Sequence, residues 1–513
     1  MALIDLIKNL DSYTKTNLLG ADTTRILRLT FTENDFDAIE DSVINEAVLV
    51  QKGCELVQSK GNRIKLLESL KKETLQDLGL SSFDELKSKY LDIIEFSKAF
   101  GIEKEYLIEK PHENRQKSEI IQPTHNELRN ISAYPHDYQR RLKNRLLTHL
   151  NNSPNQKILT SMPTGAGKTV LAMELIVDLI RTAVDSKKTN ILWVVSSKEL
   201  AEQSLQALKK LWGQKGDQPI CCQRFFGEFN TIQSFNFPTI TFATFDLLVS
   251  RLETDYIKSL LSSTSYLFID EAHQSEAFTY EKVLLDYQRI NPQYKIVGLT
   301  ATPFRSEDSE FNHFKQNFNL NEQISDDQDN YLTSPIQYLI DGSFLSRINF
   351  NLLNNSEGNV TEAEYYRTLN KAVINECKLI IERKDNTIIF AKSKSHAVAL
   401  SIYLKQNGIE NGLIIGETPD VVRKQLLSDF TNKENNLSIL VNHLILSTGI
   451  DVPGMNSIMV LGEINSPSLG LQILGRAMRG PKNGGNKKNT IYLTHQNYNR
   501  LSEFKLLETI VLN

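Results

Sequence analysis

The most constraining feature of the sequence is a glycine-rich segment, Met-Pro-Thr-Gly-Ala-Gly-Lys-Thr, at residues 162–169. It follows a short apolar run and precedes a helix-length apolar segment, so it lies where a strand would turn into a helix. Glycines at such a turn let backbone amides close around phosphate oxygens, while Lys168 supplies a cation and the Thr169 hydroxyl suits Mg²⁺. The usual pattern opens with Gly, whereas Met162 stands here, and a plain glycine turn is the other interpretation. We expect a phosphate-binding loop (P-loop) whose contacts come from Thr164, Gly165, Ala166, Gly167, Lys168 and Thr169.

A second element supplies neighbouring carboxylates. The apolar run Tyr-Leu-Phe-Ile at 266–269 leads directly into Asp270 and Glu271. A strand that ends in carboxylates delivers them to the carboxyl edge of a parallel sheet, where ligands bind in open α/β folds. Asp270 is placed to hold Mg²⁺, and Glu271 to orient or deprotonate an attacking water. An exposed acidic strand end is the alternative, and the upstream P-loop argues against it.

The 513 residues are too many for one ordinary hydrophobic core, so several structural units are expected. Differences in composition and apolar spacing along the chain indicate where these units lie. The N-terminal part lacks proline and carries helical apolar spacing. The remainder alternates β-branched runs with amphipathic segments, which predicts an α/β fold with two parallel-sheet lobes. The expected units are a helical accessory region at 1–108, a linker at 109–130, a first lobe at 131–310, an interlobe linker at 311–345 and a second lobe at 346–513.

Charge and composition exclude few functions. The net charge of −4 does not point to nucleic-acid binding, but it leaves room for a local basic groove. No apolar stretch approaches the length of a membrane span, and the N-terminus is unlike a secretion signal, so a cytoplasmic protein without membrane contact is expected. The four cysteines lack the paired spacing of a zinc site, and adjacent Cys221 and Cys222 are expected to be inert.

The motifs and their order resemble the DEAH-type helicases of superfamily 2 over roughly residues 130–495. The resemblance is carried by Asp-Glu-Ala-His at 270–273, Gly-Leu-Thr-Ala-Thr-Pro-Phe-Arg at 298–305, Ser-Thr-Gly-Ile-Asp-Val-Pro at 447–453 and Gln-Ile-Leu-Gly-Arg-Ala-Met-Arg at 472–479. It implies two RecA-like lobes and an ATP-hydrolysing enzyme that uses ATP and Mg²⁺.

The resemblance also implies a catalytic role for the last of these motifs. Arg476 and Arg479 are three positions apart, so on a helix they would share a face. The family places such a pair as arginine fingers across the interlobe cleft, and Gln472 would touch the γ-phosphate or water. Two surface arginines on a helix are the ordinary alternative.

Further roles follow from the same resemblance. Gln139 would bond the adenine base, and Thr300 and Thr302 would couple the ATP site to the strand site. The remaining implied residues are Gly449 and Asp451 at the nucleotide, and Ser197, Thr244, Phe390 and Thr448 against the nucleic-acid backbone.

The expected nucleic-acid substrate is DNA. Thr-Ala-Thr at 300–302 resembles the DNA-translocating branch, which includes restriction-enzyme motors and XPB-like and UvsW-like repair helicases, and Ile473 stands where many DEAH RNA helicases have Arg. Backbone contacts imply little sequence specificity. An RNA helicase, or an ATP-dependent switch that recruits a partner without unwinding, are the alternatives. The chain could be the motor of a DNA repair, restriction or antiviral-defence system. In restriction or defence, a nuclease or another effector subunit would supply the cutting activity, because the chain shows no nuclease signature.

Two features stay open on sequence alone. Arg141 and Arg145 would share one helix face, which is either solvated or a DNA contact. The region 1–108 could bind a partner, recognise a DNA structure or brace the first lobe, and its acidic stretch near residue 35 is best explained as a helix face.

Overall fold

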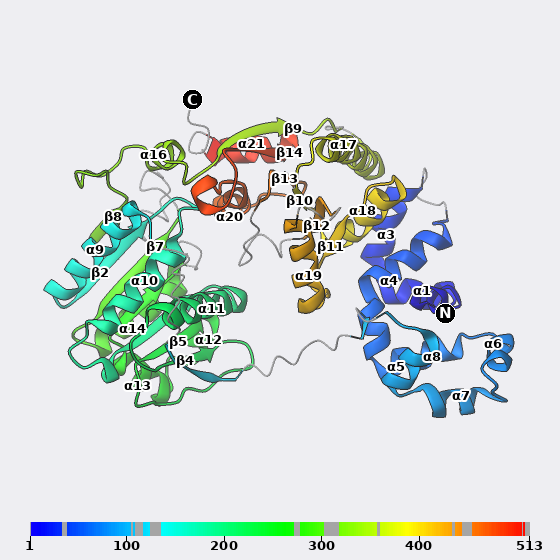
Figure 1. Cartoon of the computed structure of the whole chain (residues 1–513), viewed down its shortest axis with the longest axis horizontal. Helices are drawn as coiled ribbons and strands as arrows, with labels where there is room; N and C mark the ends of the chain where they lie inside the picture. Colours follow the sequence, from blue (N-terminus) through cyan, green and yellow to red (C-terminus); the bar gives the residue numbers. More distant parts are fainter. Residues whose placement is uncertain are drawn as a thin grey trace.

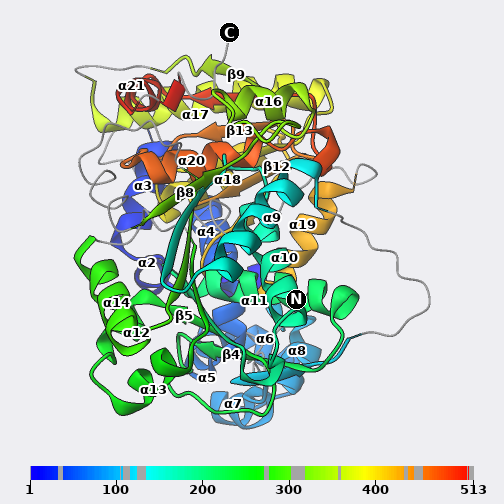
Figure 2. The ribbon, with the colours of Figure 1, turned by 90° about the vertical axis from the view of Figure 1, so that its left-hand side faces the viewer.

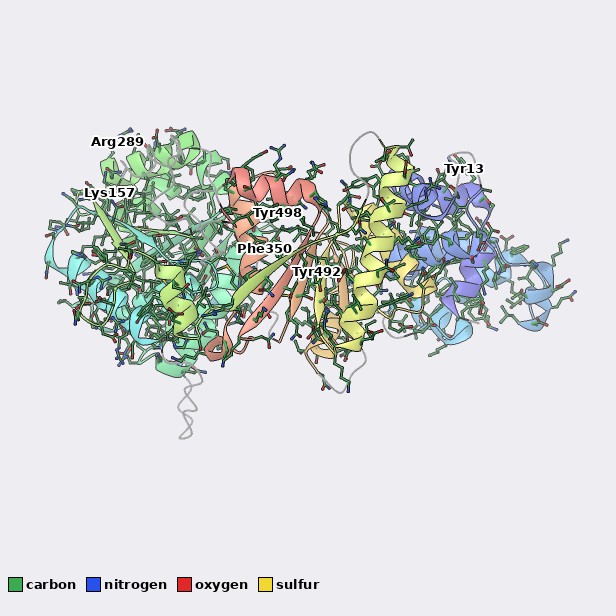
Figure 3. All side chains as sticks on the ribbon, turned by 90° about the horizontal axis from the view of Figure 1, so that it is seen from above. Tyr13, Lys157, Arg289, Phe350, Tyr492 and Tyr498 are labelled. Carbon is green, nitrogen blue, oxygen red and sulfur yellow. The ribbon has the colours of Figure 1, made fainter. Side chains whose placement is uncertain are left out.

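The structure, a computed structural model, describes residues 2–32, 38–103, 106–107, 116–123, 135–270, 277–301, 318–355, 360–432, 437–443, 454–504 and 506–507. These residues form a helical N-terminal unit and two α/β lobes. Figure 1 shows the first lobe on the left, the second lobe at the top and the N-terminal unit on the right. Seen from above, the second lobe lies between the other two units (Figure 3). The expected fold class, two RecA-like parallel-sheet lobes with a helical N-terminal region, is confirmed.

The first lobe is built on an eight-stranded sheet in the order β1-β4-β5-β3-β6-β7-β2-β8. Every described pairing is parallel except that of β1 with β4. Helices α9, α10 and α11 cover one face and α12, α13 and α14 the other (Figure 2), so the central strands are apolar on both sides. The bounds are β1 Ser118–Ile121, α9 Asp137–Asn152, β2 Gln156–Ser161, α10 Lys168–Arg181, a 3-10 turn Ser186–Lys188, β3 Asn190–Val195, α11 Lys198–Lys215, β4 Ile220–Phe225, β5 Thr239–Thr244, α12 Phe245–Ser250, α13 Asp255–Ser263, β6 Tyr266–Ile269, α14 Ala277–Ile290, β7 Lys295–Thr300 and β8 Leu320–Gln323.

The second lobe is built on a six-stranded parallel sheet in the order β11-β12-β10-β13-β14-β9. Helices α17 and α18 pack on one face, and α19, α20 and α21 on the other. The bounds are β9 Arg347–Leu352, α17 Glu362–Glu382, β10 Thr387–Phe390, α18 Lys394–Gln406, β11 Gly412–Ile414, α19 Asp420–Thr431, β12 Ile439–Asn442, β13 Ser457–Val460, α20 Pro467–Ala477, a 3-10 turn Pro481–Asn483, β14 Lys488–Leu493 and α21 His495–Glu503.

The N-terminal unit packs against the second lobe and shares a hydrophobic core with it. Helix α3 lies along α18, where the hydroxyls of Thr23 and Ser395 are 3.1 Å apart in a buried contact. The ring of Phe31 meets that of Tyr403 edge-on at 5.6 Å between centroids. The suggestion that this region braces the first lobe is therefore wrong. Its helices are α1 Leu3–Lys8, α2 Ser12–Leu19, α3 Ala21–Phe31, α4 Asp41–Gln58, α5 Lys60–Glu68, α6 Lys72–Asp77, α7 Phe83–Tyr90 and α8 Ile93–Phe100.

Two segments expected to be linkers contain strands of the first lobe. Within 109–130, β1 pairs with β4, and buried Arg224 of β4 binds Glu119 at 2.6 Å and Glu202 at 2.8 Å. Within 311–345, β8 is the edge strand beside β2, and α16 Pro335–Asp341 follows it. Both expected boundaries are thus corrected. Short, polar edge strands take their conformation from a partner rather than from their own pattern, so the sequence did not reveal them.

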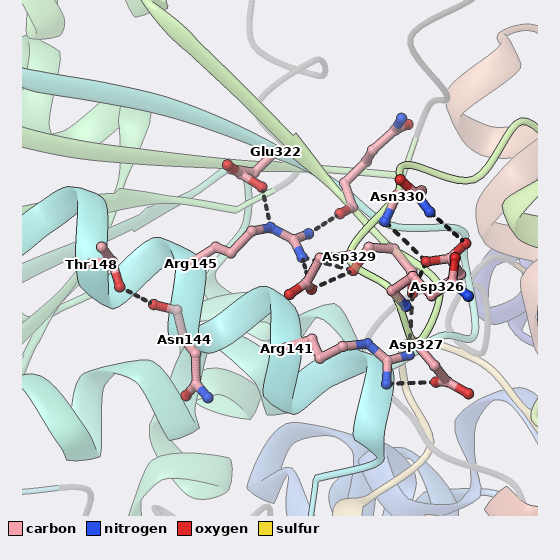
Figure 4. Close-up of polar contacts among 12 residues, drawn as sticks. Arg141, Asn144, Arg145, Thr148, Glu322, Asp326, Asp327, Asp329 and Asn330 are labelled. Atoms are coloured by element: carbon pink, nitrogen blue, oxygen red, sulfur yellow. Dashed lines mark hydrogen bonds and ion pairs between the residues drawn. The ribbon is translucent and has the colours of Figure 1, made fainter.

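The basic face of α9 serves the fold. Arg145 binds Glu322 at 2.8 Å and Asp329 at 3.2 Å, and Arg141 binds Asp327 at 2.8 Å (Figure 4). Glu322 lies in β8, and Asp327 and Asp329 lie between β8 and α16, so the face fastens α9 to the edge strand and the connection that follows it. Neither the solvated face nor the DNA contact considered for these arginines describes what the structure shows.

Buried His396 predicts a pH-dependent stability of the second lobe. Its Nδ1 accepts from the Lys392 amide at 3.2 Å and its Nε2 faces Asn370 Oδ1 at 2.9 Å, which fixes a neutral ring. Burial, and then the positive charges of Lys392 and His443, lower its pKa to about 3. The unfolded chain therefore takes up a proton that the folded chain excludes, so stability present above about pH 6.5 is lost as the pH falls.

Between pH 7 and pH 5 this residue should remove about 2 kcal/mol of unfolding free energy. The measurement is chemical unfolding of the protein and of a His396→Gln variant, which lacks the titrating ring, at both pH values. An equal loss in the two proteins would contradict the assignment.

Candidate functional site

The P-loop joins β2 to α10, as its sequence predicts. Gly165 and Gly167 adopt φ values of +81° and +83°, which side-chain-bearing residues rarely adopt. Lys168 is the first residue of α10 and is only 9% exposed, so most of its side chain is shielded from solvent. Met162 is fully buried in the core of the lobe and its amide donates to the Thr300 carbonyl at 3.0 Å. Its backbone is not left-handed, so the position does not need the expected glycine.

Tyr138 and Gln139, at the start of α9, hold the P-loop through hydrogen bonds to its backbone. The Gln139 amide nitrogen donates to the Ala166 carbonyl at 3.0 Å, and its oxygen accepts from the His136 amide at 2.9 Å. The Tyr138 hydroxyl donates to the same Ala166 carbonyl at 2.9 Å, and burial raises the pKa of this phenol. The structure thus assigns Gln139 contacts to the loop backbone, whereas the resemblance implied a contact with the base. Tyr138 belongs to the same short sequence motif, but the resemblance assigned a role to Gln139 alone.

The carboxyl edge of the sheet places Asp270 near the P-loop strand. Asp270 follows β6, is 6% exposed, and donates its amide to the Val194 carbonyl at 3.0 Å. Only β7 separates β6 from β2 in the sheet. Fully buried Thr300 ends β7 and holds the first residue of the P-loop segment through its carbonyl. Glu271 and Thr302 lie outside the described residues.

These donors fit a nucleotide with Mg²⁺. The Thr169 hydroxyl in the first turn of α10 and the Asp270 carboxylate are oxygen ligands of the kind Mg²⁺ prefers. The Thr164 hydroxyl is buried without a hydrogen-bond partner, as expected of a group that faces a ligand. Among the described residues no cluster of His, Cys, Asp and Glu forms a separate metal site. Cys221 and Cys222 are buried in β4, and burial raises both thiol pKa values, which supports the expectation that they are inert.

The arginine-bearing segment of the second lobe differs from its expected form. Gln472 and Arg476 lie on α20, but the helix ends at Ala477, so Arg479 lies beyond it in an extended bridge with Leu345. The prediction that both arginines share a helix face is therefore wrong. The reason is a contact with a distant part of the chain: the Ser346 amide donates to the Met478 carbonyl at 2.9 Å and draws the chain out of the helix.

Buried polar side chains hold this turn in place. The Asn489 amide nitrogen donates to the Ala477 carbonyl at 2.6 Å and to the Ser346 hydroxyl at 3.1 Å. The Ser346 hydroxyl in turn bonds the Arg479 carbonyl. Sequence reasoning missed Ser346 and Asn489, because Ser346 directly precedes β9, Asn489 lies in β14, and only the folded sheet brings them to the end of α20.

The P-loop and α20 face each other directly across the interlobe boundary. A Cβ built on Gly165 would lie 3.2 Å from Leu345 Cδ2 and 3.5 Å from the Gly475 carbonyl oxygen. Beside them, the His136 ring contacts Asn483 Oδ1 at 2.8 Å. Residues from both lobes therefore meet at one boundary, with the P-loop on one side and the C-terminal end of α20 on the other.

The predicted nucleic-acid contacts lie at the carboxyl ends of strands. Ser197 is the N-cap of α11 and accepts from the Leu200 amide at 3.3 Å, and Thr244 is the N-cap of α12. Phe390 is 1% exposed in the core of the second lobe, so its side chain is not available to a nucleic-acid strand, and this assignment is corrected. As the last residue of a central parallel strand it is covered on both faces. The remaining predicted residues, Thr448, Gly449 and Asp451, lie outside the described residues.

Two protein-family profiles match the chain. Residues 132–305 match "Type III restriction enzyme, res subunit", and residues 369–481 match "Helicase conserved C-terminal domain". In the described part of the chain no helix is long and apolar enough to cross a membrane.

Known proteins resemble the chain at modest identity. IRC3 of Saccharomyces cerevisiae is 25% identical over 63% of this chain and 46% of its own length. The ATP-dependent DNA helicase MPH1 of the same species is 28% identical over 37% of this chain and 19% of its own length. The chain spans about half the length of the first curated relatives it matches. Among solved structures, the DEAD-box helicase Mss116 bound to single-stranded RNA has a TM-score of 0.51 and 17% identity over 76% of this chain and 80% of its own, which shows the same fold.

Proposed function

Because the chain belongs to superfamily 2 of the helicases and is an ATP-hydrolysing enzyme, we propose that it is a motor that moves along or unwinds DNA. The observation that carries the proposal is the two-sided site, in which the P-loop of one lobe meets the arginine-bearing segment of the other. In such a site, hydrolysis depends on how closely the two lobes approach each other. The same relative movement of the lobes can shift a nucleic-acid strand that is bound to both of them. Mg²⁺ held by Thr169 and Asp270 is part of the proposal.

Two comparisons support the choice of DNA: a relative and the family profile that matches the first lobe. MPH1 is named a DNA helicase, and the first-lobe profile is named after a restriction-enzyme subunit. The strand-end positions of Ser197 and Thr244 suit backbone contacts that read little sequence. RNA is the second candidate, because Mss116, which shares the fold, is bound to RNA.

A defence or repair setting extends the proposal. The family profile of a restriction subunit favours a motor that works beside a nuclease or another effector supplied by a partner. We place the protein in the cytoplasm, and the four free cysteines suit a reducing compartment.

The substrate is tested by ATP turnover with single-stranded DNA, duplex DNA, forked DNA and RNA in parallel. We expect turnover to rise with DNA and to remain at the basal rate with RNA. Stimulation by RNA alone would overturn the choice of DNA, and equal turnover with and without any nucleic acid would contradict the motor.

A further inference from the structure

The P-loop and α20 approach each other through a residue without a side chain. Gly475 lies in α20, directly before Arg476, and faces Thr164 of the P-loop. A Cβ built on Gly475 would lie 1.9 Å from Thr164 Cγ2 and 2.9 Å from Thr164 Cβ. Ordinary contacts between carbon atoms are about 3.5–4.0 Å. Helix α20 therefore reaches the P-loop only because residue 475 is glycine.

The helix itself gives no reason for this glycine. Gly475 is not among the residues with positive φ, so its backbone conformation is open to any residue. Alanine in place of glycine would favour the helix by about fivefold in its equilibrium constant. The position thus carries a residue that weakens the helix, and the contact with Thr164 is what the glycine permits.

The Thr164 side of the contact is also specific. Its Cγ2 methyl group is the part that lies nearest to Gly475 of the second lobe, and its buried hydroxyl has no hydrogen-bond partner among the described residues. Next to it, Gly165 lies under Leu345 and Met478, so the tip of the loop is covered by the second lobe. The meeting of Thr164 and Gly475 thus fixes the spacing between the loop and α20.

We propose that Gly475 and Thr164 are positioning residues that set how closely α20, and with it Arg476, approaches the nucleotide phosphates. A side chain at 475 would push the helix away by about 1.5–2 Å to restore ordinary contact. A misplacement of about 1 Å can lower a catalytic rate by roughly 10²-fold. The inference rests on the ATP-hydrolysing activity and is independent of the choice between DNA and RNA.

The test is a double-mutant cycle in the full-length chain. Gly475→Ala should lower kcat for ATP by about 10²-fold and leave the affinity for a fluorescent ATP analogue unchanged, because the substitution alters none of the phosphate-binding groups of the P-loop. Thr164→Ser removes the Cγ2 methyl group and keeps the hydroxyl. In the Thr164→Ser background, Gly475→Ala should therefore cost at least about tenfold less than it does alone.

Gly470→Ala is the matched control on the same helix, since the three nearest neighbours of its Cβ would be Leu506, Ile464 and Leu501, all of the second lobe, at 3.0–3.3 Å. Thermal unfolding of each variant checks that the fold is kept. The inference is overturned if Gly475→Ala turns over ATP like the parent, or if its defect is the same in both backgrounds. Absence of turnover in the parent protein would instead contradict the enzymatic assignment.

Discussion

Replacing Arg476 by alanine is expected to lower ATP turnover by about 10³–10⁵-fold, the usual value of an arginine finger, while nucleotide still binds. Arg476 lies on α20 directly after the glycine that meets the P-loop. A guanidinium held there would stabilise the charge that develops on the transferring phosphoryl group. Arg479 is expected to behave alike. The measurement is kcat for ATP at saturating nucleic acid, with affinity for an ATP analogue measured separately.

Arg500→Ala is the control, because Arg500 lies on α21 of the same lobe, half exposed, and pairs with Glu503. It should leave turnover near the parental rate. Lysine at 476 keeps the charge but not the planar fork of donors, so it should recover only part of the activity. If alanine at 476 and at 479 left kcat within a few-fold of the parent, the second lobe would not take part in hydrolysis.

The second large effect is expected at the P-loop. Lys168→Ala should lower ATP turnover by at least about 10²–10³-fold, as removal of one stabilising donor from a reacting site usually does, and should weaken nucleotide binding as well. Lys168 begins α10 and is 9% exposed, so after its removal water would have little access to take over its interactions with a phosphate. Initial-rate assays of phosphate release and titration with an ATP analogue measure both effects.

Lys188→Ala serves as the control, because this exposed lysine lies in the same lobe and pairs only with Asp185 in the described part of the chain. An unchanged rate for Lys168→Ala would remove the P-loop from the reaction.

Local patterns predicted what a short stretch of chain determines alone. The P-loop lies between a strand and a helix because glycines with positive φ and an apolar segment follow one another in the sequence. Asp270 lies at the edge of the sheet because it directly follows the apolar run that forms β6. Even the unusual Met162 has a local explanation, since its backbone does not need glycine and its side chain fills the core.

The errors arose where distant segments decide the conformation. Arg479 leaves the helix because Ser346, which is far away in the sequence and directly precedes β9, donates its amide to the Met478 carbonyl. Strand β8 exists because β2 offers it an open edge, and Phe390 is buried because helices cover both faces of its sheet. The N-terminal unit joins the second lobe although the first follows it in the chain, since its apolar surface matches α17 and α18. No single-sequence pattern reports such partners.

The most direct test of the central claim, that ATP hydrolysis between the lobes drives movement along DNA, is displacement of a third strand from duplex DNA. A triplex-forming oligonucleotide is bound at increasing distances from the duplex end, and its release is followed after ATP is added. We expect release that requires ATP, shows a delay that grows with distance, and is lost with Arg476→Ala. ATP hydrolysis that proceeds while the third strand stays bound at every distance would contradict the account.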